Sequence, residues 1–215
     1  MTKRKMTKRN KYLLPVLGAL ALACAPLAAS AQPGLIETKK CAECHGQGGA
    51  STKSTVPILA GASEFFLENQ FFQYQDSLRP CYAEAFEKMD DAPAADHCDL
   101  VKDMTEDDFM ELAAYYAEQP KVAADQPFDP DLAAIGAQVH EEACDRCHSD
   151  GGSLALDDAG ILAGQWKEYL LSSMKIFLTD GRWQEERMQE EMAPLSEDQL
   201  RALAEYYASE GQRFQ

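Results

Sequence analysis

Hydrophobic side chains recur at helical spacing in two stretches of the chain. One runs from Phe65 to Tyr74 and the other from Tyr169 to Leu178. In both stretches the apolar positions follow the spacing of an α-helix. No stretch of the sequence rich in Val, Ile and Thr alternates apolar with polar positions as a half-buried strand does. The pattern therefore predicts an all-α fold.

Two further helices are predicted from their N-terminal signals. Thr105 and Ser196 each stand three positions before a side chain that completes a capping box, Asp108 and Gln199 respectively. A hydroxyl side chain at the N-cap and acidic residues in the first turn both stabilise the start of a helix. Each half of the chain is therefore expected to close with a capped helix.

These paired helices belong to an internal repeat. The motif Cys-x-x-Cys-His occurs at 41–45 and at 144–148, and the Leu-Ala-Gly triplets at 59–61 and 162–164 follow their motifs at the same distance. Arg79 and Arg182 also follow the two triplets at equal distances, and Leu-Ala-x-Tyr-Tyr-Ala closes both copies. Landmarks in the same order at matching distances indicate a tandem duplication.

The repeat divides the chain into two domains. Three prolines and little hydrophobic periodicity between Gln119 and Asp131 indicate a linker. The predicted domains are therefore 32–119 and 131–215, joined by 120–130. Each domain has about 85 residues, which is small for a self-sufficient hydrophobic core. We expect a bound group to supply further buried apolar surface.

The segment that ends at Ala31 has the composition of a cleaved export signal. A basic N-terminus precedes the apolar run Tyr12–Ala28, and Ala29-Ser30-Ala31 forms a small-residue cleavage site. A membrane anchor would need about 20 apolar residues, and Pro15 and Pro26 interrupt this run. Cys24 as an acylated N-terminus is the other alternative, although the residues before it match that processing pattern poorly. We expect cleavage after Ala31, a periplasmic protein and no transmembrane segment in the mature chain.

The charge balance narrows the range of partners. The chain has 20 basic and 36 acidic side chains, a net charge of −16. Six of the basic residues and none of the acidic ones lie in the predicted signal, so the mature chain carries −22. A charge of this sign argues against a role in binding nucleic acid or an anionic membrane surface. The predicted cleavage also leaves six cysteines in an oxidising compartment.

The two Cys-x-x-Cys-His motifs indicate covalent haem attachment. A redox dithiol would be expected in a βαβ pattern, which the sequence lacks, and a zinc site would need further ligands, for which the second domain offers only His140. Two thiols at this spacing add to the two vinyl groups of a haem, and the histidine that follows binds the iron. The predicted residues are Cys41, Cys44, Cys144 and Cys147 for attachment of two haem c groups, with His45 and His148 as proximal iron ligands.

The repeat also predicts the second iron ligand of the second domain. Met188 lies between the arginine of the repeat and the capped helix, 18 residues before Tyr206. Met192 is the rival, but it lies one turn nearer the capped helix. A thioether ligand raises the reduction potential of a haem. Met188 is therefore the predicted distal ligand of the second domain.

In the first domain a histidine occupies the corresponding place. His97 precedes Tyr115 by the same interval that separates Met188 from Tyr206. Met89 is an alternative, although it is eight positions out of register, and Cys98 or an open iron is another. A solvated loop histidine is the alternative without a function. His97 is the preferred distal ligand because its place is fixed by the repeat and not by its residue type.

An insertion precedes His97. The interval from Arg79 to His97 is three times as long as that from Arg182 to Met188, so the first domain carries a twelve-residue insertion. Cys81 and Cys98 bracket the insertion, and two free cysteines are not expected in an oxidising compartment. We predict a disulfide between them, which would stabilise the fold by roughly 3 kcal/mol because it lowers the conformational entropy of the unfolded chain.

A proline distinguishes the loop after the first motif. Pro57 stands where the second domain has Gly160. The backbone carbonyl at this place is a candidate acceptor for the N–H of the proximal imidazole, a contact that orients the ring of a metal-bound histidine. Proline is expected to fix this carbonyl more rigidly than glycine does.

Taken together these residues resemble a known family. Two Cys-x-x-Cys-His domains in tandem, each followed by Leu-Ala-Gly and ending in Leu-Ala-x-Tyr-Tyr, look like the cytochrome c4 family, whose fold is a pair of class I cytochrome c domains. The resemblance implies His/Met ligation and electron transfer in the periplasm, which carries over to His45, His148 and Met188, whereas His97 departs from the family's methionine. The second domain is also similar to that of the di-haem subunit of flavocytochrome c sulfide dehydrogenase.

The predicted function is that of a periplasmic di-haem electron carrier with unequal haems, the first of lower potential. An electron-accepting subunit of a sulfide dehydrogenase-like flavoprotein complex is the alternative, and a haem enzyme acting on a sulfur compound is the third. An electron carrier or electron-transfer subunit is favoured over an enzyme. The expected partners are redox proteins, with a flavoprotein dehydrogenase and a terminal oxidase as candidates.

Overall fold

The computed structural model describes residues 34–35, 39–81, 96–179 and 181–214. These residues form helices and no strand, which confirms the predicted all-α fold. The predicted export signal, most of the insertion and Met89 lie outside the described residues. Among the described helices, none is long and apolar enough to cross a membrane.

The first group of helices packs around α3 and α5. The described elements, which we call the first unit, are α2 (Cys41–His45), a 3₁₀ turn (Gln47–Gly49), α3 (Glu64–Gln75), α4 (His97–Val101) and α5 (Glu106–Ala117). Helix α5 lies against α3, and Phe109 of α5 is fully buried between Phe71 and Phe72 of α3, at centroid distances of 5.3 and 5.1 Å. The predicted helix over Phe65–Tyr74 is thus present, and it packs Phe71 and Phe72 against α5 while Phe65 stays exposed.

The second group of helices packs around α10. We call these elements the second unit: α6 (Pro130–Val139), a π-helical turn (His140–Cys144), α7 (Ser149–Gly152), a 3₁₀ turn (Ala155–Asp157), α8 (Lys167–Leu178), α9 (Glu186–Met192), α10 (Glu197–Glu210) and a 3₁₀ turn (Gly211–Phe214). Helix α10 crosses α6 at a glycine, because a Cβ on Gly136 would overlap the carbonyl oxygen of Ala202. The short approach lets the two helices bury their small residues.

Both closing helices begin as the sequence predicts. Thr105 caps α5 and Ser196 caps α10, and in each case the side chain three positions later, Asp108 or Gln199, accepts a hydrogen bond from the N-cap backbone N–H. These reciprocal bonds satisfy N–H groups that would otherwise lack partners at the helix start.

The sequence repeat is also a repeat in three dimensions. Gly61 and Gly164, the glycines of the two Leu-Ala-Gly triplets, have φ angles of 71° and 72°, a conformation that favours glycine. Their amides donate to the carbonyls of Tyr116 and Tyr207, at 2.9 and 2.7 Å. The same turn therefore ties the loop after each Cys-x-x-Cys-His motif to the closing helix of its unit.

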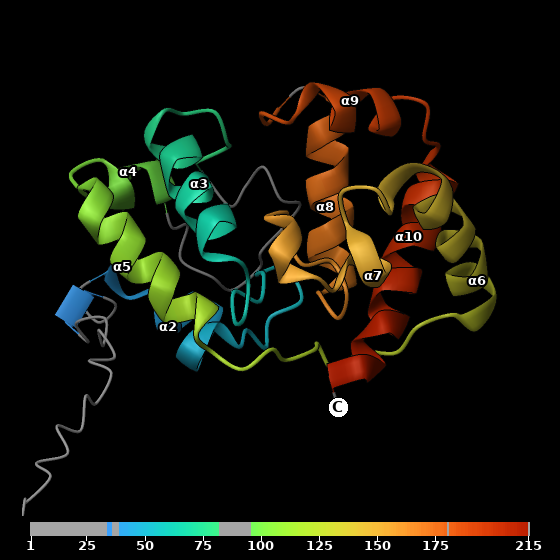
Figure 1. Cartoon of the computed structure of the whole chain (residues 1–215), viewed down its shortest axis with the longest axis horizontal. Helices are drawn as coiled ribbons and strands as arrows, with labels where there is room; N and C mark the ends of the chain where they lie inside the picture. Colours follow the sequence, from blue (N-terminus) through green and yellow to red (C-terminus); the bar gives the residue numbers. More distant parts are fainter. Residues whose placement is uncertain (1–33, 36–38, 82–95, 180, 215) are drawn as a thin grey trace, which may run out of the picture.

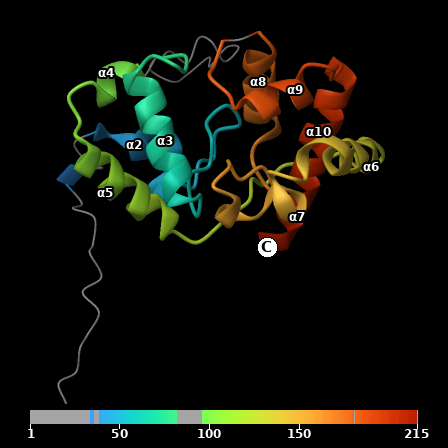
Figure 2. The same cartoon turned by 45° about the horizontal axis from the view of Figure 1, so that its top comes forward.

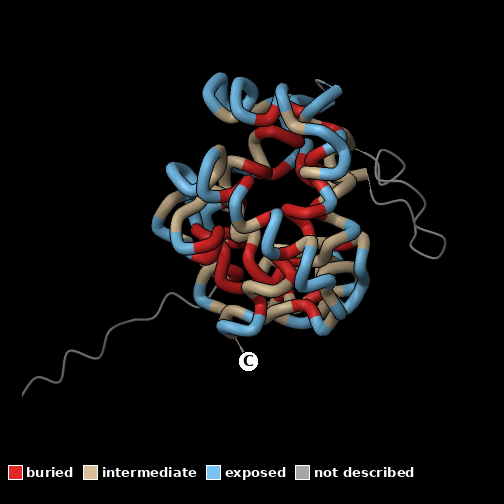
Figure 3. Tube along the Cα trace, turned by 90° about the vertical axis from the view of Figure 1, so that its right-hand side faces the viewer, coloured by how far each residue is buried: buried red, intermediate tan, exposed pale blue. Residues whose placement is uncertain are grey.

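The two units lie side by side, and the chain between α5 and α6 runs along one edge of both (Figures 1 and 2). Buried segments lie in the interior of the molecule, with exposed segments around them (Figure 3). Polar side chains join the units: Ser63 donates to Asp158 at 2.6 Å, and Arg79 donates to the hydroxyl of Tyr169 at 3.2 Å.

Candidate haem sites

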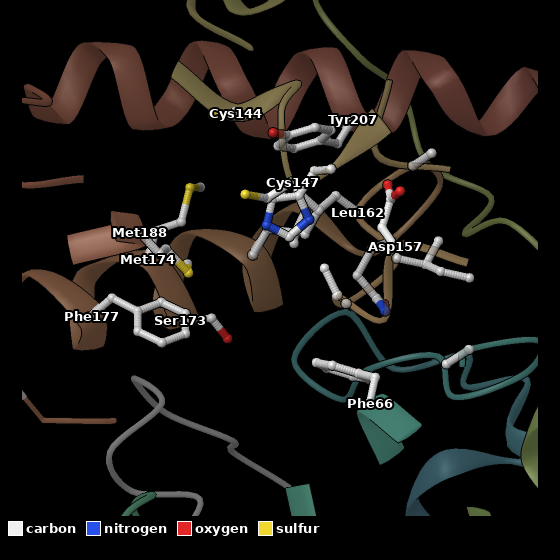
Figure 4. A pocket seen from close by; sticks show the side chains of 18 of the residues that line it. Phe66, Cys144, Cys147, Asp157, Leu162, Ser173, Met174, Phe177, Met188 and Tyr207 are labelled. Carbon is white, nitrogen blue, oxygen red and sulfur yellow. The ribbon is translucent and has the colours of Figure 1, made fainter. Parts of the chain in front are cut away.

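A large cavity opens between the motif and the distal helix of the second unit. Its volume is about 1170 Å³, above the usual range of small-molecule sites. Cys144, Cys147 and His148 line one side, and Met188 and Met192 line another. Figure 4 shows the labelled side chains around this space, with the cysteines and Met188 bordering the same opening. The cavity is large and apolar enough to take a haem-sized group.

His148 presents the chemistry of a metal ligand at this cavity. Burial lowers its pKa to about 4, and the opposing effect of the Gly160 carbonyl is smaller. Its Nδ1 faces that carbonyl without reaching a well-formed hydrogen bond. The imidazole is therefore neutral at pH 7, which is the form that binds a metal ion.

The cysteines of both motifs remain free thiols. Cys41, Cys44, Cys144 and Cys147 are unpaired and at least partly accessible. Burial is the main influence on Cys41 and Cys144 and raises the pKa of each thiol, while a tyrosine hydroxyl of the closing helix lowers it. Cys144 and Cys147 also line the cavity, a position that fits covalent attachment of a haem.

In the first unit two histidines face each other. The ring centroids of His45 and His97 are 6.2 Å apart and their planes are inclined by 72°. Two imidazoles that bind one metal ion from opposite sides, each at roughly 2.0 Å, have centroids about 6 Å apart. Nδ1 of His45 lies 3.0 Å from the carbonyl oxygen of Pro57, as the sequence predicts for the proximal residue, so Nε2 is the nitrogen left for iron. The spacing fits a bis-histidine haem.

Several contacts fix His97 in this position. Its ring stacks on Tyr74, at 4.7 Å and 15°, and its backbone N–H donates to the carbonyl of Cys81 at 2.9 Å. Its side chain is half-buried, and burial, with a smaller contribution from His45, lowers its pKa to about 4. The alternative of a solvated loop histidine is thus wrong for the described structure.

A disulfide joins Cys81 and Cys98 across a sequence separation of 17 residues, with Cα atoms 5.1 Å apart. It closes the segment that contains the insertion and anchors the first turn of α4, where His97 stands. The bonded Cys98 sulfur is not a free thiolate, so the alternative of Cys98 as an iron ligand is wrong. The other alternative, Met89, lies outside the described residues.

Met188 and Met192 occupy different surroundings on α9. Met192 is buried and belongs to the core of the second unit, whereas Met188 is only partly buried and packs on the edge of that core. Both line the cavity. A side chain that already fills the core is less available to a ligand, which favours Met188 over Met192.

Two buried arginines supply charge between the units. Arg79 and Arg182 are 6% and 8% exposed, and both donate to Oε1 of Gln70. Each guanidinium also lies over an aromatic ring of its own unit, Tyr74 at 4.7 Å and Phe177 at 4.6 Å. Within the described part of the chain neither arginine pairs with a carboxylate, and both Nε atoms lack a partner.

Two buried guanidinium groups without a carboxylate partner among the described residues favour a nearby anion, because removing charge from water is costly unless it is compensated. Haem carries two carboxylates, so a haem in each unit would provide the missing partners. The sequence identifies these arginines only as equivalent positions of the repeat and does not assign them to the site. Their equal distance from the two Leu-Ala-Gly triplets was the signal available.

Comparison with known proteins agrees with this geometry. The family model described as cytochrome c oxidase, cbb3-type, subunit III matches residues 131–206. Cytochrome c4 of Thiocapsa roseopersicina is 26% identical over 178 residues, covering 77% of this chain and 84% of that protein.

Solved structures show the same arrangement. Reduced recombinant cytochrome c4 from Pseudomonas stutzeri superposes with a TM-score of 0.66 at 23% identity, over 83% of this chain and 97% of that one. Cytochrome c4 of Acidithiobacillus ferrooxidans gives 0.65 at 22% identity, over 79% and 98%. The thiosulfate dehydrogenase TsdBA of Marichromatium purpuratum gives 0.62 at 27% identity, over 79% of this chain and 36% of that longer one. The chain is thus homologous to cytochrome c4 in sequence and structure and has the fold of two tandem class I cytochrome c domains.

Proposed function

We propose that this protein is a periplasmic di-haem c-type cytochrome that transfers electrons between redox partners through two unequal haems. Attachment would be through Cys41 and Cys44 in domain 32–119 and through Cys144 and Cys147 in domain 131–215. The observation that carries the proposal is the repeated motif, whose histidine stands opposite a second histidine in one unit and across a cavity from a methionine in the other.

The difference in distal residue supports unequal reduction potentials of the two haems. When bound, haem supplies one-electron Fe(III)/Fe(II) chemistry. His45 and His148 would hold the iron from the proximal side, with His97 and Met188 opposite. A thioether stabilises the reduced iron more than an imidazole does. The first domain is therefore expected to have the lower potential, which favours electron movement toward the second.

The N-terminal pattern and the cofactor support the periplasm as the location. A basic segment, an apolar run and a small-residue cleavage site direct export, and the disulfide between Cys81 and Cys98 is of the kind that persists in oxidising compartments.

Mass spectrometry and a redox titration of the purified protein test the proposal. We expect a mass with two haems, two separated waves, and a methionine-to-ferric charge-transfer band from one haem only. His97→Ala should open the first iron to cyanide, while Met89→Leu, the matched control, should leave both haems six-coordinate. Two equal waves, or cyanide binding only in Met89→Leu, would refute unequal His/His and His/Met ligation.

A second candidate is the haem-bearing, electron-accepting subunit of a dehydrogenase complex. The likeness to thiosulfate dehydrogenase TsdBA, of which this chain spans 36%, supports a dehydrogenase partner. Co-purification of a stoichiometric second chain with flavin or dehydrogenase activity would decide for it. A monomer that exchanges electrons freely with small carriers would decide against it.

A third candidate, a haem enzyme for a sulfur compound, now depends on an open iron in the first unit, because Cys98 is bonded to Cys81. Sulfide or cyanide binding to the resting ferric protein would support it. A resting protein inert to both would count against it.

A further inference from the structure

The second unit forms hydrogen bonds with the loop that contains the Pro57 carbonyl. The side chain of Gln165, only 7% exposed, donates from Nε2 to the carbonyl of Ile58 at 3.0 Å and accepts at Oε1 from the Ile58 N–H at 2.9 Å. One side chain thus satisfies both backbone groups of a residue in the other unit. Such a paired contact fixes both the position and the orientation of that stretch of backbone.

Two neighbouring contacts hold the same loop. The indole N–H of Trp166 donates to the carbonyl of Ser51 at 3.0 Å, and the backbone N–H of Tyr169 donates to the carbonyl of Ser54 at 3.1 Å. The start of α8 and the two residues before it therefore span the loop from residue 51 to residue 58. Its conformation depends on the docking of the second unit.

The gripped peptide group is the one that His45 uses. The C=O of Pro57 and the N–H of Ile58 belong to a single planar amide. The C=O lies 3.0 Å from Nδ1 of His45, while the N–H donates to Gln165. An acceptor on the N–H of an amide polarises its carbonyl and strengthens the hydrogen bond made there. A stronger bond at Nδ1 raises the basicity of the other ring nitrogen.

We propose that Gln165 is a positioning residue through which the second unit sets the orientation and basicity of the proximal histidine of the first. This rests on the proposed function, because it concerns the potential of a haem bound by His45. Gln165 touches neither His45 nor iron and acts through the Pro57–Ile58 amide. Undocking of the two units would release the amide and raise the potential of the first haem, since a less basic ligand stabilises ferric iron less.

The second unit acts on the proximal histidine of the first unit, and the described contacts give no equivalent hydrogen bond in the reverse direction. The residue after the Leu-Ala-Gly triplet is Gln165 in the second unit and Ala62 in the first, and alanine has no side-chain donor or acceptor. The counterpart of Pro57, Gly160, meets the first unit through packing: a Cβ there would lie 3.0 Å from the ring of Phe66. The proximal histidine of the second unit thus lacks this type of hydrogen-bonded link within the described contacts.

The test compares Gln165→Leu with Trp166→Phe in the two-haem protein. Leucine keeps the volume and removes both hydrogen bonds to Ile58, whereas phenylalanine removes one interdomain hydrogen bond without touching the amide. In Gln165→Leu we expect the ferrous-to-ferric ratio of the first haem at fixed potential to rise about threefold, or roughly 30 mV at about 59 mV per tenfold for one electron. The Nδ1 proton of His45, followed by NMR in the reduced protein, should exchange about tenfold faster.

Trp166→Phe should change both quantities less than Gln165→Leu does, and Gln165→Ala, which adds no bulk, should match Gln165→Leu. Equal changes in Gln165→Leu and Trp166→Phe, an equal shift of both haems, or an unchanged His45 proton would overturn the role of Gln165. Absence of two haems in the wild-type mass would instead overturn the proposed function, so the two failures are distinguishable.

Discussion

The two units hold their candidate distal ligands in different ways. In the first, His97 begins α4, stacks on Tyr74 and stands beside a disulfide, and its ring is 6.2 Å from that of His45. In the second, Met188 lies on the short helix α9 at the edge of a cavity of about 1170 Å³. The first candidate site is thus held by ring stacking and a disulfide, whereas the second borders a cavity of haem size.

The duplication kept the turns and the arginines of the two units, whereas the distal segments and the residue pair Pro57 and Gly160 diverged. The turns at Gly61 and Gly164 agree in conformation and in partner. The arginines also recur, each over an aromatic ring of its unit. What changed is the segment after each arginine, where the first unit gained an insertion and a disulfide.

The largest expected effect is loss of the haem in the second unit. Cys144→Ala together with Cys147→Ala should abolish the cooperative unfolding transition of that unit, because an apolar cavity of this size cannot stay open to water. Cys41→Ala with Cys44→Ala is the matched pair. Circular dichroism melting with limited proteolysis should show greater loss for the second unit, and the reverse order would contradict the comparison.

Exchanging the distal residues should reverse the order of the potentials. His97→Met is expected to raise the first potential by on the order of 100 mV, and Met188→His should lower the second by a similar amount, since axial ligands tune iron over several hundred millivolts. Spectroelectrochemical titration measures both. Met192→Leu serves as the control and should leave the second wave in place; if it removes the methionine band, Met192 is the ligand.

Removal of the disulfide should weaken the first unit alone. Cys81→Ser with Cys98→Ser opens a loop across a separation of 17 residues, which should cost about 3 kcal/mol of unfolding free energy. Guanidinium titration followed at the bands of each haem would separate the units. An equal loss in the second unit would mean that the two unfold as one body.

The smallest expected effect is a pH dependence of the free energy of unfolding of the second unit, caused by His140. The Nδ1 atom of His140 lies 3.0 Å from the Tyr207 hydroxyl, so His140 is a packing residue. Burial lowers its pKa below 6.5, and the opposing effect of Asp145, 3.4 Å from Nε2, is smaller. The unfolded histidine therefore binds a proton at higher pH than the folded one.

Its stabilising contribution is present above about pH 6.5 and is lost as the pH falls toward the lowered pKa of the folded protein. The free energy of unfolding should be lower at pH 5 than at pH 7, by less than removal of the disulfide lowers it. His140→Gln should flatten this dependence in the second unit, and an unchanged slope would show that another group is responsible.

Much of the site followed from local sequence because its signals are local. Capping boxes, helical periodicity and Cys-x-x-Cys-His each involve residues within a few positions of one another. The spacing of the repeat then identified Arg182 as the equivalent of Arg79 and His97 as the equivalent of Met188. The Pro57 carbonyl was also found in this way, since it is 12 residues from His45 and within the same loop.

The contacts between the units could not be found in this way. Gln165 and Ile58 are 107 residues apart, and Gln70 and Arg182 are 112 apart. Nothing in the residue types says which polar side chain will meet which backbone group once two folded surfaces dock. Sequence spacing orders residues along one chain, whereas docking selects among many surfaces of similar polarity.

The sequence by itself determined the all-α class, the duplication, the two attachment motifs and the contrast between a histidine and a methionine at one place in the repeat. The folded structure was needed to show that His97 faces His45, that Arg79 and Arg182 meet at Gln70, and that the amide on His45 is held from the other unit. The reason is physical: propensity and spacing act along the backbone, while the burial of charge and the pairing of distant hydrogen-bonding groups arise only when separate parts of the chain exclude water together.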